Sequence, residues 1–490
     1  MLAADARAKQ HGKNSYDLMR AAGLAVAAEV VKRYSSPQAV VVVAGPGNNG
    51  GDGAIAAEAL AGHGYQVSMV RYGADKVKQS DAQRAFSACK QPGFEVDDAI
   101  NEEVAALIAG ADILIDALLG AGLSREPTGV LAALIHAMNA SRAAVLAVDL
   151  PSGVNGNAHT ASACTIQADL TVTFFRLKIA HVLMPVKALC GEVVLVQIGL
   201  DEQELAGEEL LCELNEPELW RSSLFPPGPT DYKYSRGHVL VRGGDEQSSG
   251  AARLTAQTAL NCGAGAVTVS CPQSALPVYA AHLTAVMLRV HHDELDFARM
   301  LSDRRINTVA LGPGNGVGEL TRRFVVTSVQ AGKCCVLDAD ALTSFSDAPS
   351  LLFHALAEAH NTAILTPHQG EFERLFPELA AKTGQSRLHQ AASAAKLSQA
   401  VVVLKGSDTV IASPDGQSRI NTNAPPWLAT AGSGDVLCGV IASLVAMGMP
   451  AYNAACAGVY LHAQAANQLR FPMTAEQLCV QVPDVIAQLW

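Results

Sequence analysis

Short runs of β-branched and aliphatic residues alternate with Ala-rich segments of helical spacing through the first part of the chain. The apolar runs predict buried strands at residues 39–44, 66–71, 112–116, 143–149, 170–175 and 191–200. Residues 15–34 and 128–140 repeat their apolar positions with the period of a helix. Strand–helix–strand alternation predicts right-handed crossovers and a parallel sheet. We therefore expect a Rossmann-like α/β domain here.

The composition changes near residue 200, and the alternation then restarts. The acidic stretch DEQELAGEELLCELNEPELW is followed by FPPGPTDYKYSRG, which is rich in Pro and Gly. We interpret residues 206–236 as a linker between domains at 1–205 and 237–490. Further strands are predicted at residues 238–244, 265–270, 307–312, 334–340, 361–367, 401–406 and 409–413. The predicted fold class is thus α/β, with two three-layer domains.

Composition narrows the classes of partner and compartment. The chain has 490 residues, of which 49% are hydrophobic and 17% charged, which is typical of globular domains. A net charge of −11 argues against a nucleic-acid partner or an anionic membrane surface. The eleven cysteines include no C-x-x-C pair, the N-terminal segment has no apolar core, and no apolar run is long enough to span a membrane. We expect a cytoplasmic protein without a membrane span, and a homo-oligomer because glycine-rich α/β enzymes of this size often assemble.

The stretch AGPGNNGGDG follows the first predicted strand and contains G-x-G-x-x-G at Gly45, Gly47 and Gly50. A Rossmann domain that uses NAD as a cofactor would carry an acid at the end of the second strand. Arg71 stands there instead. No Lys-Ser or Lys-Thr follows the glycines, so the loop is not a P-loop either. Tight turn geometry alone is the simplest alternative for such a glycine-rich loop.

Polar clusters follow three of the predicted strands, and ligands of open α/β sheets bind at these carboxyl ends. Asn49, Asp116 and Ser152 supply oxygen atoms that suit a cation such as K⁺ or Mg²⁺, or contacts to a sugar. Asp149 or Asp116 could act as a general acid or base if its pKa is raised in a partly closed site. Asp149 could instead cap the following turn.

The segments GNNGGDG, DALLGAGL and VDLPSGVNG, in this order, closely resemble the epimerase domain of NAD(P)H-hydrate repair enzymes. TVTFFRLKIAHVL and VVLVQIGL are similar to its closing strands, and the resemblance covers about residues 10–200. It implies contacts to the damaged dinucleotide from two loops and Asp149, and a K⁺ ion at Asn49, Asp116 and Ser152. The implied substrate-binding loop residues are Asn48, Asn49, Gly50, Gly51, Asp52, Gly120, Ala121, Gly122, Leu123, Ser124, Arg125 and Glu126.

The strongest signal of the second half is ATAGSGDVLCGVIASL, residues 429–444. A Gly-rich turn opens a helix there, and amide groups at a helix N-terminus stabilise phosphoryl oxygens. Asp435 lies in the first turn and could take a proton from a hydroxyl that attacks phosphorus. Its alternative role is that of an acid that favours the helix start. LGPGNG, TPHQGEFERL and VVVLKGSDTV, which brings Lys405 to a strand end, also follow apolar runs.

G-S-G-D before a terminal helix resembles ribokinase-like kinases. With GHVLVRGG, VLDADAL, LTPHQGEFERL and VVLKGSDTVI, it looks like the ADP/ATP-dependent NAD(P)H-hydrate dehydratase domain, over about residues 232–488. The resemblance implies a ribokinase-like sheet and contacts to the hydrated dinucleotide from Ala252, Gly314, His368 and Asp435. The implied nucleotide-binding residues are Lys405, Gly406, Ser407, Asp408, Thr409 and Gly434. His368 could otherwise be a simple turn residue, and NAPPWLATAGSGD departs from the family's more glycine-rich approach.

The two resemblances together predict a bifunctional repair enzyme. The first domain would interconvert the S and R epimers of hydrated NADH or NADPH, with K⁺ bound. The second domain would dehydrate the S hydrate with ADP or ATP, with Asp435 as base and Mg²⁺ accompanying the nucleotide. The alternatives are a ribokinase-type small-molecule kinase fused to a ligand-binding domain, and a first domain that only senses ligand or docks protein.

Overall fold

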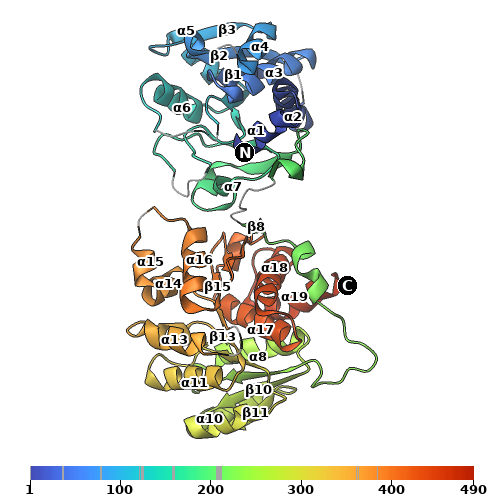
Figure 1. The fold of residues 1–490 in the computed structure, drawn as a ribbon, viewed down its shortest axis with the longest axis vertical. Coiled ribbons are helices and arrows are strands. Elements are labelled where there is room, and N and C mark those ends of the chain that lie inside the picture. Colours follow the sequence, from blue (N-terminus) through green and yellow to red (C-terminus); the bar gives the residue numbers. More distant parts are fainter. Residues whose placement is uncertain are drawn as a thin grey trace. The chain divides into compact units, whose positions relative to one another are not determined.

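A computed structural model describes residues 2–35, 38–77, 80–120, 122, 126–156, 161–205, 212–359, 361, 363–382 and 384–489. The chain divides into two compact units, residues 1–209 and 210–490 (Figure 1). No helix within these described ranges is long and apolar enough to cross a membrane.

The first unit is built on a parallel sheet. Within the described residues it has seven strands in the order β3-β2-β1-β4-β5-β6-β7. The strands are β1 Ala39–Ala44, β2 Gln66–Tyr72, β3 Gly93–Val96, β4 Ile113–Ala117, β5 Ala144–Val148, β6 Leu170–Phe174 and β7 Glu192–Val196. The first six follow the 3-2-1-4-5-6 order of the Rossmann fold, so the predicted Rossmann-like sheet is confirmed. The order reverses between β1 and β4, which is where such folds bind ligands.

Helices cover both faces of this sheet. Successive side chains of each strand point to opposite faces, so a strand can pack against helices on both sides. Val40 and Val42 pack with residues of α2 and α3, whereas Val41 and Val43 pack with residues of α5 and α6. The helices are α1 Leu2–Gln10, α2 Ser15–Arg33, α3 Asn48–Gly62, η1 Ala74–Lys76, α4 Asp81–Ala88, α5 Glu102–Ala109, α6 Val130–Ala140, α7 Ile179–Val182, η2 Val186–Leu189 and η3 Glu202–Leu205. The result is the three-layer arrangement predicted from the sequence.

The second unit contains a larger, mixed sheet. Its described strands follow the order β11-β10-β9-β12-β13-β14-β15-β16-β17-β8. Neighbours are parallel from β11 to β15, whereas β15–β16 and β16–β17 are antiparallel and β8 lies parallel to β17. The strands are β8 Glu213–Leu214, β9 His238–Arg242, β10 Ala266–Cys271, β11 Met287–Val290, β12 Thr308–Leu311, β13 Cys334–Leu337, β14 Ile364–Leu365, β15 Val401–Leu404, β16 Val410–Ala412 and β17 Ser418–Ile420.

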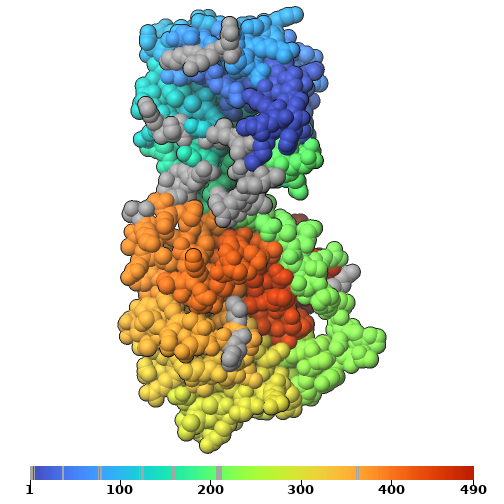
Figure 2. All heavy atoms as spheres, in the orientation of Figure 1, coloured from blue at the N-terminus to red at the C-terminus, as the bar shows by residue number. Residues whose placement is uncertain are grey.

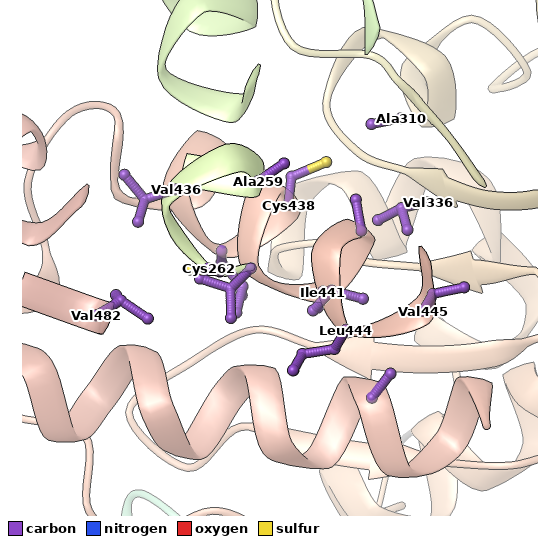
Figure 3. Packing of buried hydrophobic residues seen from close by; sticks show 14 of the residues in the cluster. Ala259, Cys262, Ala310, Val336, Val436, Cys438, Ile441, Leu444, Val445 and Val482 are labelled. Atoms are coloured by element: carbon purple, nitrogen blue, oxygen red, sulfur yellow. The ribbon is translucent and has the colours of Figure 1, made fainter. Parts of the chain in front are cut away.

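The core of the second unit surrounds α17, which is buried along most of its length. Figure 3 shows Cys438 and Ile441 of α17 near Cys262 of α8, Val482 of α19 and Val336 of β13. The helices are η4 Pro217–Leu219, η5 Arg221–Ser223, α8 Ser249–Asn261, η6 Gln273–Ala275, α9 Leu276–His282, α10 Glu294–Leu301, α11 Glu319–Gln330, α12 Asp340–Thr343, α13 Pro349–Ala357, α14 Gln369–Leu375, α15 Pro377–Ala380, α16 Arg387–Ser398, η7 Pro426–Leu428, α17 Ser433–Ala446, α18 Ala451–Leu469 and α19 Ala475–Ala487. Small residues along α17 and α18 allow this close helix packing.

Much of the segment expected to link the domains packs on the second unit. β8 adds a strand to its sheet, and Trp220 is fully buried with its ring 5.7 Å from that of Tyr460 in α18. Figure 2 shows this green segment lying against the red surface of the C-terminal helices. The acidic composition of residues 201–220 hid Trp220, which anchors this segment in the core.

Candidate active sites

The glycines of the first loop have different steric roles. A Cβ on Gly45 would lie 2.0 Å from the carbonyl oxygen of Leu118, and one on Gly50 would lie 1.9 Å from that of Gly45. These two positions require glycine because the turn and the start of α3 pack against backbone. A Cβ on Gly47, which caps α3, would have no atom within 4 Å. Gly47 therefore faces open space at the amino end of α3.

Asn49, Asp116 and Ser152 lie together where β1, β4 and β5 end. Ser152 donates to Asp116 from its hydroxyl over 2.6 Å and from its backbone N–H over 2.7 Å. The Asn49 amide donates to the carbonyl oxygens of Leu119 and Val148 at 2.9 and 2.8 Å. All three polar residues are buried. The structure thus brings together three residues predicted as ion ligands.

The chemistry of this cluster fits a bound K⁺ ion. It combines carboxylate, hydroxyl, amide and carbonyl oxygens, the ligands that hard cations prefer. Burial raises the pKa of Asp116 to about 6, and the hydrogen bonds from Ser152 and the Leu118 N–H act against this rise. Because its oxygens already accept these donors, Asp116 is better suited to hold the loops or an ion than to exchange protons with substrate.

Asp149 follows β5 and contacts a lysine. Its carboxylate accepts hydrogen bonds from Lys178 and, over 2.9 Å, from the hydroxyl of Thr173. The side chains of Lys178 and Asp149 are 8% and 15% exposed, so the ion pair is shielded but reachable. Asp149 has φ of +65°, a conformation that costs free energy for a non-glycine residue and clusters at functional sites.

His181 holds the backbone of Asp149 in place through a hydrogen bond. Its Nδ1 accepts from the Lys178 N–H at 3.0 Å, so Nε2 carries the proton and donates to the Asp149 carbonyl at 2.8 Å. Burial, with a further contribution from Lys178, lowers the pKa of His181 to about 4 and keeps the ring neutral. Lys178, Thr173 and His181 had no predicted role, although TVTFFRLKIAHVL begins inside β6, the strand that pairs with β5.

The remaining predicted residues of the first site are placed only in part. Ala121, Leu123, Ser124 and Arg125 lie outside the described residues. Gly120 approaches Asn49, since a Cβ on it would lie 3.1 Å from Asn49 Oδ1. Glu126 is exposed and accepts from Ser162 over 2.6 Å. Asn48 is exposed at the start of α3, whereas Gly50, Gly51 and Asp52 are buried in its first turns.

The second site lies at the amino end of α17. Gly432 caps this helix with φ of +85°, a conformation that favours glycine. Asp435 is half-buried in the first turn, and its pKa is raised to about 6 by burial and by the charges of Asp338 and Asp340, with Lys405 opposing. A carboxyl group with such a pKa suits general base catalysis near neutral pH.

Lys405, which follows β15, interacts with acidic residues that follow β13 and β14. Its Nζ donates to Asp338 over 2.6 Å and lies 3.9 Å from a carboxylate oxygen of Glu371. A Cβ on Gly434 would lie 3.6 Å from both Asp338 Oδ2 and Lys405 Nζ, so the start of α17 faces this ion pair. Burial alone would lower the pKa of Lys405, but Asp338 and Glu371 raise it above its usual value. Lys405 is therefore a fixed cation beside Asp435.

His368 and the KGSDT turn flank the lysine. His368 caps α14 reciprocally with Glu371, and its ring is 55% exposed. Arg387 holds the turn from below, donating to the carbonyl oxygen of Lys405 at 2.9 Å and pairing with Asp408 at 3.2 Å. His368 and Lys405, both predicted to bind ligand, form a β-bridge and therefore lie next to each other. Asp408, which was predicted to bind nucleotide, is buried.

Other predicted positions differ in exposure. The side chain of Ala252 is fully buried in the core. Gly314 has φ of +65° and packs on Ser248, since a Cβ would lie 2.3 Å from its carbonyl oxygen. Thr409 closes the KGSDT turn by donating to the Gly406 carbonyl at 2.7 Å, and Ser407 is exposed. Asp338, Glu371 and Arg387 had no predicted role. Asp338 was placed inside the strand predicted at 334–340, which ends at Leu337, and Glu371 lies in HQGEFERL, after the next predicted strand.

The fold and these two sites define a two-domain α/β enzyme, with acidic residues at the ligand-binding edge of each sheet. A family model described as YjeF-related protein N-terminus matches residues 15–180, and one described as NAD(P)H-hydrate dehydratase matches residues 239–484. The bifunctional NAD(P)H-hydrate repair enzyme Nnr of Thermofilum pendens is 33% identical, over 94% of this chain and 88% of its own. That of Escherichia coli is 32% identical, over 94% and 86%. The chain belongs to the bifunctional NAD(P)H-hydrate repair enzyme family.

Solved structures resemble the second unit. A ribokinase-like superfamily protein from Enterococcus faecalis is 22% identical with a TM-score of 0.51, covering 58% of this chain and 99% of its own. That likeness agrees with the predicted ribokinase-like sheet. The ADP/ATP-dependent NAD(P)H-hydrate dehydratase of Bacillus subtilis, co-crystallised with ATP and Mg²⁺, is 26% identical with a TM-score of 0.49, covering 58% and 99%.

Proposed function

We propose that this chain repairs hydrated NADH and NADPH with two active sites. The first unit interconverts the S and R hydrates, and the second dehydrates the S hydrate with ADP or ATP. Membership of the bifunctional family over nearly the whole chain supports both activities. The structural observation that supports the dehydratase activity most directly is Asp435, whose carboxyl group lies with a raised pKa beside Lys405 and Asp338 at a helix N-terminus.

In the first unit, the Asp149–Lys178 pair moves the proton. The hydrated carbon, C6, bonds to both the hydroxyl and the ring nitrogen. Asp149 removes the hydroxyl proton, the bond between C6 and the nitrogen breaks to leave an aldehyde at C6, and the nitrogen takes a proton. The nitrogen then gives up that proton and bonds to the opposite face of C6, and the oxygen regains a proton, which gives the other epimer. Asp149 is partly exposed and Lys178 can return a proton, whereas Asp116 is fully buried and already accepts several hydrogen bonds. We therefore assign proton transfer to Asp149 and a structural role to Asp116.

Asn49, Asp116 and Ser152 would hold K⁺ in this unit. The ion, when bound, supplies positive charge that orders the loops after β4 and β5. The chain's own contribution is the buried oxygen cluster, which fixes Leu119 and Val148 through Asn49. Asp149 lies directly after Val148, so this cluster also positions the proton-transfer residue.

In the second unit, Asp435 takes the proton from the C6 hydroxyl of the hydrate. The oxygen of that hydroxyl attacks the terminal phosphorus of ADP or ATP. The phosphoanhydride bond breaks, and AMP or ADP leaves. The phosphate ester then loses inorganic phosphate and a C5 proton, which restores the double bond of NAD(P)H. Amide groups of Gly432 and Gly434 at the start of α17, and Lys405, stabilise the transferred group.

The nucleotide would lie against the KGSDT turn, which Arg387 holds in place. Mg²⁺, when bound with the nucleotide, neutralises phosphate charge. Among the described residues no group of three or more His, Cys, Asp and Glu could hold a metal ion, which suits an ion bound mainly by phosphates. Cys262, Cys438 and Cys456 are buried thiols, which supports a reducing, cytoplasmic location. The homo-oligomer stays a prediction.

The dehydratase proposal predicts a fixed stoichiometry. Incubation of the chain with S-NADH hydrate and ADP or ATP should release one inorganic phosphate for each NADH formed, because the phosphate ester is only an intermediate. The measurement is phosphate assayed in parallel with NADH absorbance. A phosphorylated product that accumulates without phosphate release would instead indicate the ribokinase-type kinase. A reaction without the nucleotide serves as the control.

A further inference from the structure

A pocket lies at the carboxyl ends of β1 and β2, beside the glycine loop. Its volume is about 180 Å³, and Ala44, Gly45, Arg71, Tyr72, Phe86 and Ser87 contribute to its lining. A cavity of roughly 150 Å³ accepts a benzene ring, so this pocket has room for a sugar. In Rossmann domains the corresponding position, at the tip of the second strand, binds the adenosine ribose.

The glycine loop next to the pocket has the geometry for a dinucleotide. Gly45 and Gly50 are required by packing, whereas Gly47 faces open space at the amino end of α3. These are the roles of the first, third and second glycines of a dinucleotide-binding turn, whose second glycine lets the pyrophosphate approach. A pyrophosphate at Gly47 would place the attached ribose at the tip of β2, since Ala44 and Arg71 are register neighbours.

Arg71 is the charged residue of this pocket and has unused hydrogen-bonding capacity. Its Nε is buried and has no hydrogen-bond partner among the described residues. Its guanidinium lies 5.7 Å from the centre of the Phe86 ring and pairs with Glu95 on the edge strand β3. Glu95 is 56% exposed, and exposed ion pairs contribute little, so it competes weakly with an incoming anion.

We propose that Arg71 binds the 2′-phosphate of NADPH hydrate and makes the epimerase site prefer NADPH hydrate over NADH hydrate. An acid at this strand tip would accept hydrogen bonds from the ribose hydroxyls and repel a phosphate, whereas a guanidinium donates to phosphate oxygens in a matching fork. Tyr72 and Ser87 line the same pocket. This inference rests on the proposed epimerase function of the first unit.

The test compares Arg71→Gln and Glu95→Gln with the unchanged chain. Pure R-NADPH hydrate or R-NADH hydrate is incubated without ADP or ATP, so that the dehydratase is inactive. The appearance of the S epimer is measured by chromatography. In the unchanged chain kcat/KM should be about 10- to 100-fold higher for NADPH hydrate. Arg71→Gln should remove this preference by raising KM for NADPH hydrate, whereas kcat/KM for NADH hydrate, which lacks the 2′-phosphate, should fall much less. Glu95→Gln should keep the preference or increase it.

The outcomes separate the inference from the function on which it rests. Equal kcat/KM for the two hydrates in the unchanged chain, or an equal loss for both in Arg71→Gln, would overturn the role of Arg71 while epimerisation itself stands. Absence of epimerisation of either hydrate by the unchanged chain would overturn both. Thermal unfolding of Arg71→Gln at the temperature of the unchanged chain shows that this variant folds.

Discussion

Replacing Asp435 by Asn should lower kcat for dehydration of the S hydrate by about 10²–10⁴-fold, the usual contribution of a general base. Asn keeps the size of the side chain and its place in the first turn of α17, but it cannot accept the C6 hydroxyl proton. Lys405 and the helix N-terminus remain in place, so binding of nucleotide and substrate should change much less than kcat. The measurement is the initial rate of NADH formation from S-NADH hydrate with ADP or ATP.

Epimerisation by the same variant chain provides the control, because Asp435 belongs to the second unit. The pH profile gives an independent readout of the base. Since the pKa of Asp435 is raised to about 6, the active carboxylate is present above that pH, and kcat/KM should fall as pH drops through it. Normal turnover by Asp435→Asn would refute its role as base.

Asp149→Asn should lower the rate of epimerisation by about 10²–10⁴-fold and leave dehydration of the S hydrate unchanged. The amide can still accept from Thr173 but can neither take a proton nor carry the charge that faces Lys178. Lys178→Met, which removes the other member of the pair, should give a loss of the same order. Chromatography of the S epimer formed from the R hydrate, without nucleotide, measures both variants.

A structural role of the pair must be separated from a chemical one. Thr173→Val removes one hydrogen bond to Asp149 without changing any titratable group, so it should cost much less activity than Asp149→Asn. Thermal unfolding of all three variants shows whether the first unit stays folded. Full epimerisation by Asp149→Asn, with loss in Asp116→Asn, would transfer the acid–base role to Asp116.

Most of the strands that the sequence reveals are buried. β1, β4 and β9 are buried along all or nearly all of their length and each contains at least three consecutive apolar residues, because helices cover both sides of a parallel sheet. β3 and β11, which were not predicted, are four-residue edge strands whose apolar pattern is interrupted by a charged residue, whereas the edge strand β7 keeps the apolar run VVLV and was predicted. β8 has only two residues, too short for any period to show.

Sequence reasoning could find site residues near a strand end, such as Asn49 after β1 and Asp116 in β4, because parallel strand ends meet at one edge. It found Asp435 from the Gly-rich turn that opens α17. It could not pair residues across the sheet. Lys178 reaches Asp149 only because β6 lies beside β5, and Lys405 reaches Asp338 across β14. These pairs depend on strand order, which the local pattern does not contain.

The central claim is that one chain carries both repair activities. The direct measurement is the recovery of reduced nicotinamide absorbance from a mixture of S and R NADH hydrates, with ADP or ATP in excess and traces of spontaneous epimerisation subtracted. We predict complete recovery by the unchanged chain. The Asp149→Asn variant should recover absorbance at the same rate until the S epimer is consumed, and more slowly after that. Recovery by the unchanged chain that stops when the S epimer is exhausted, or no recovery at all, would contradict the account.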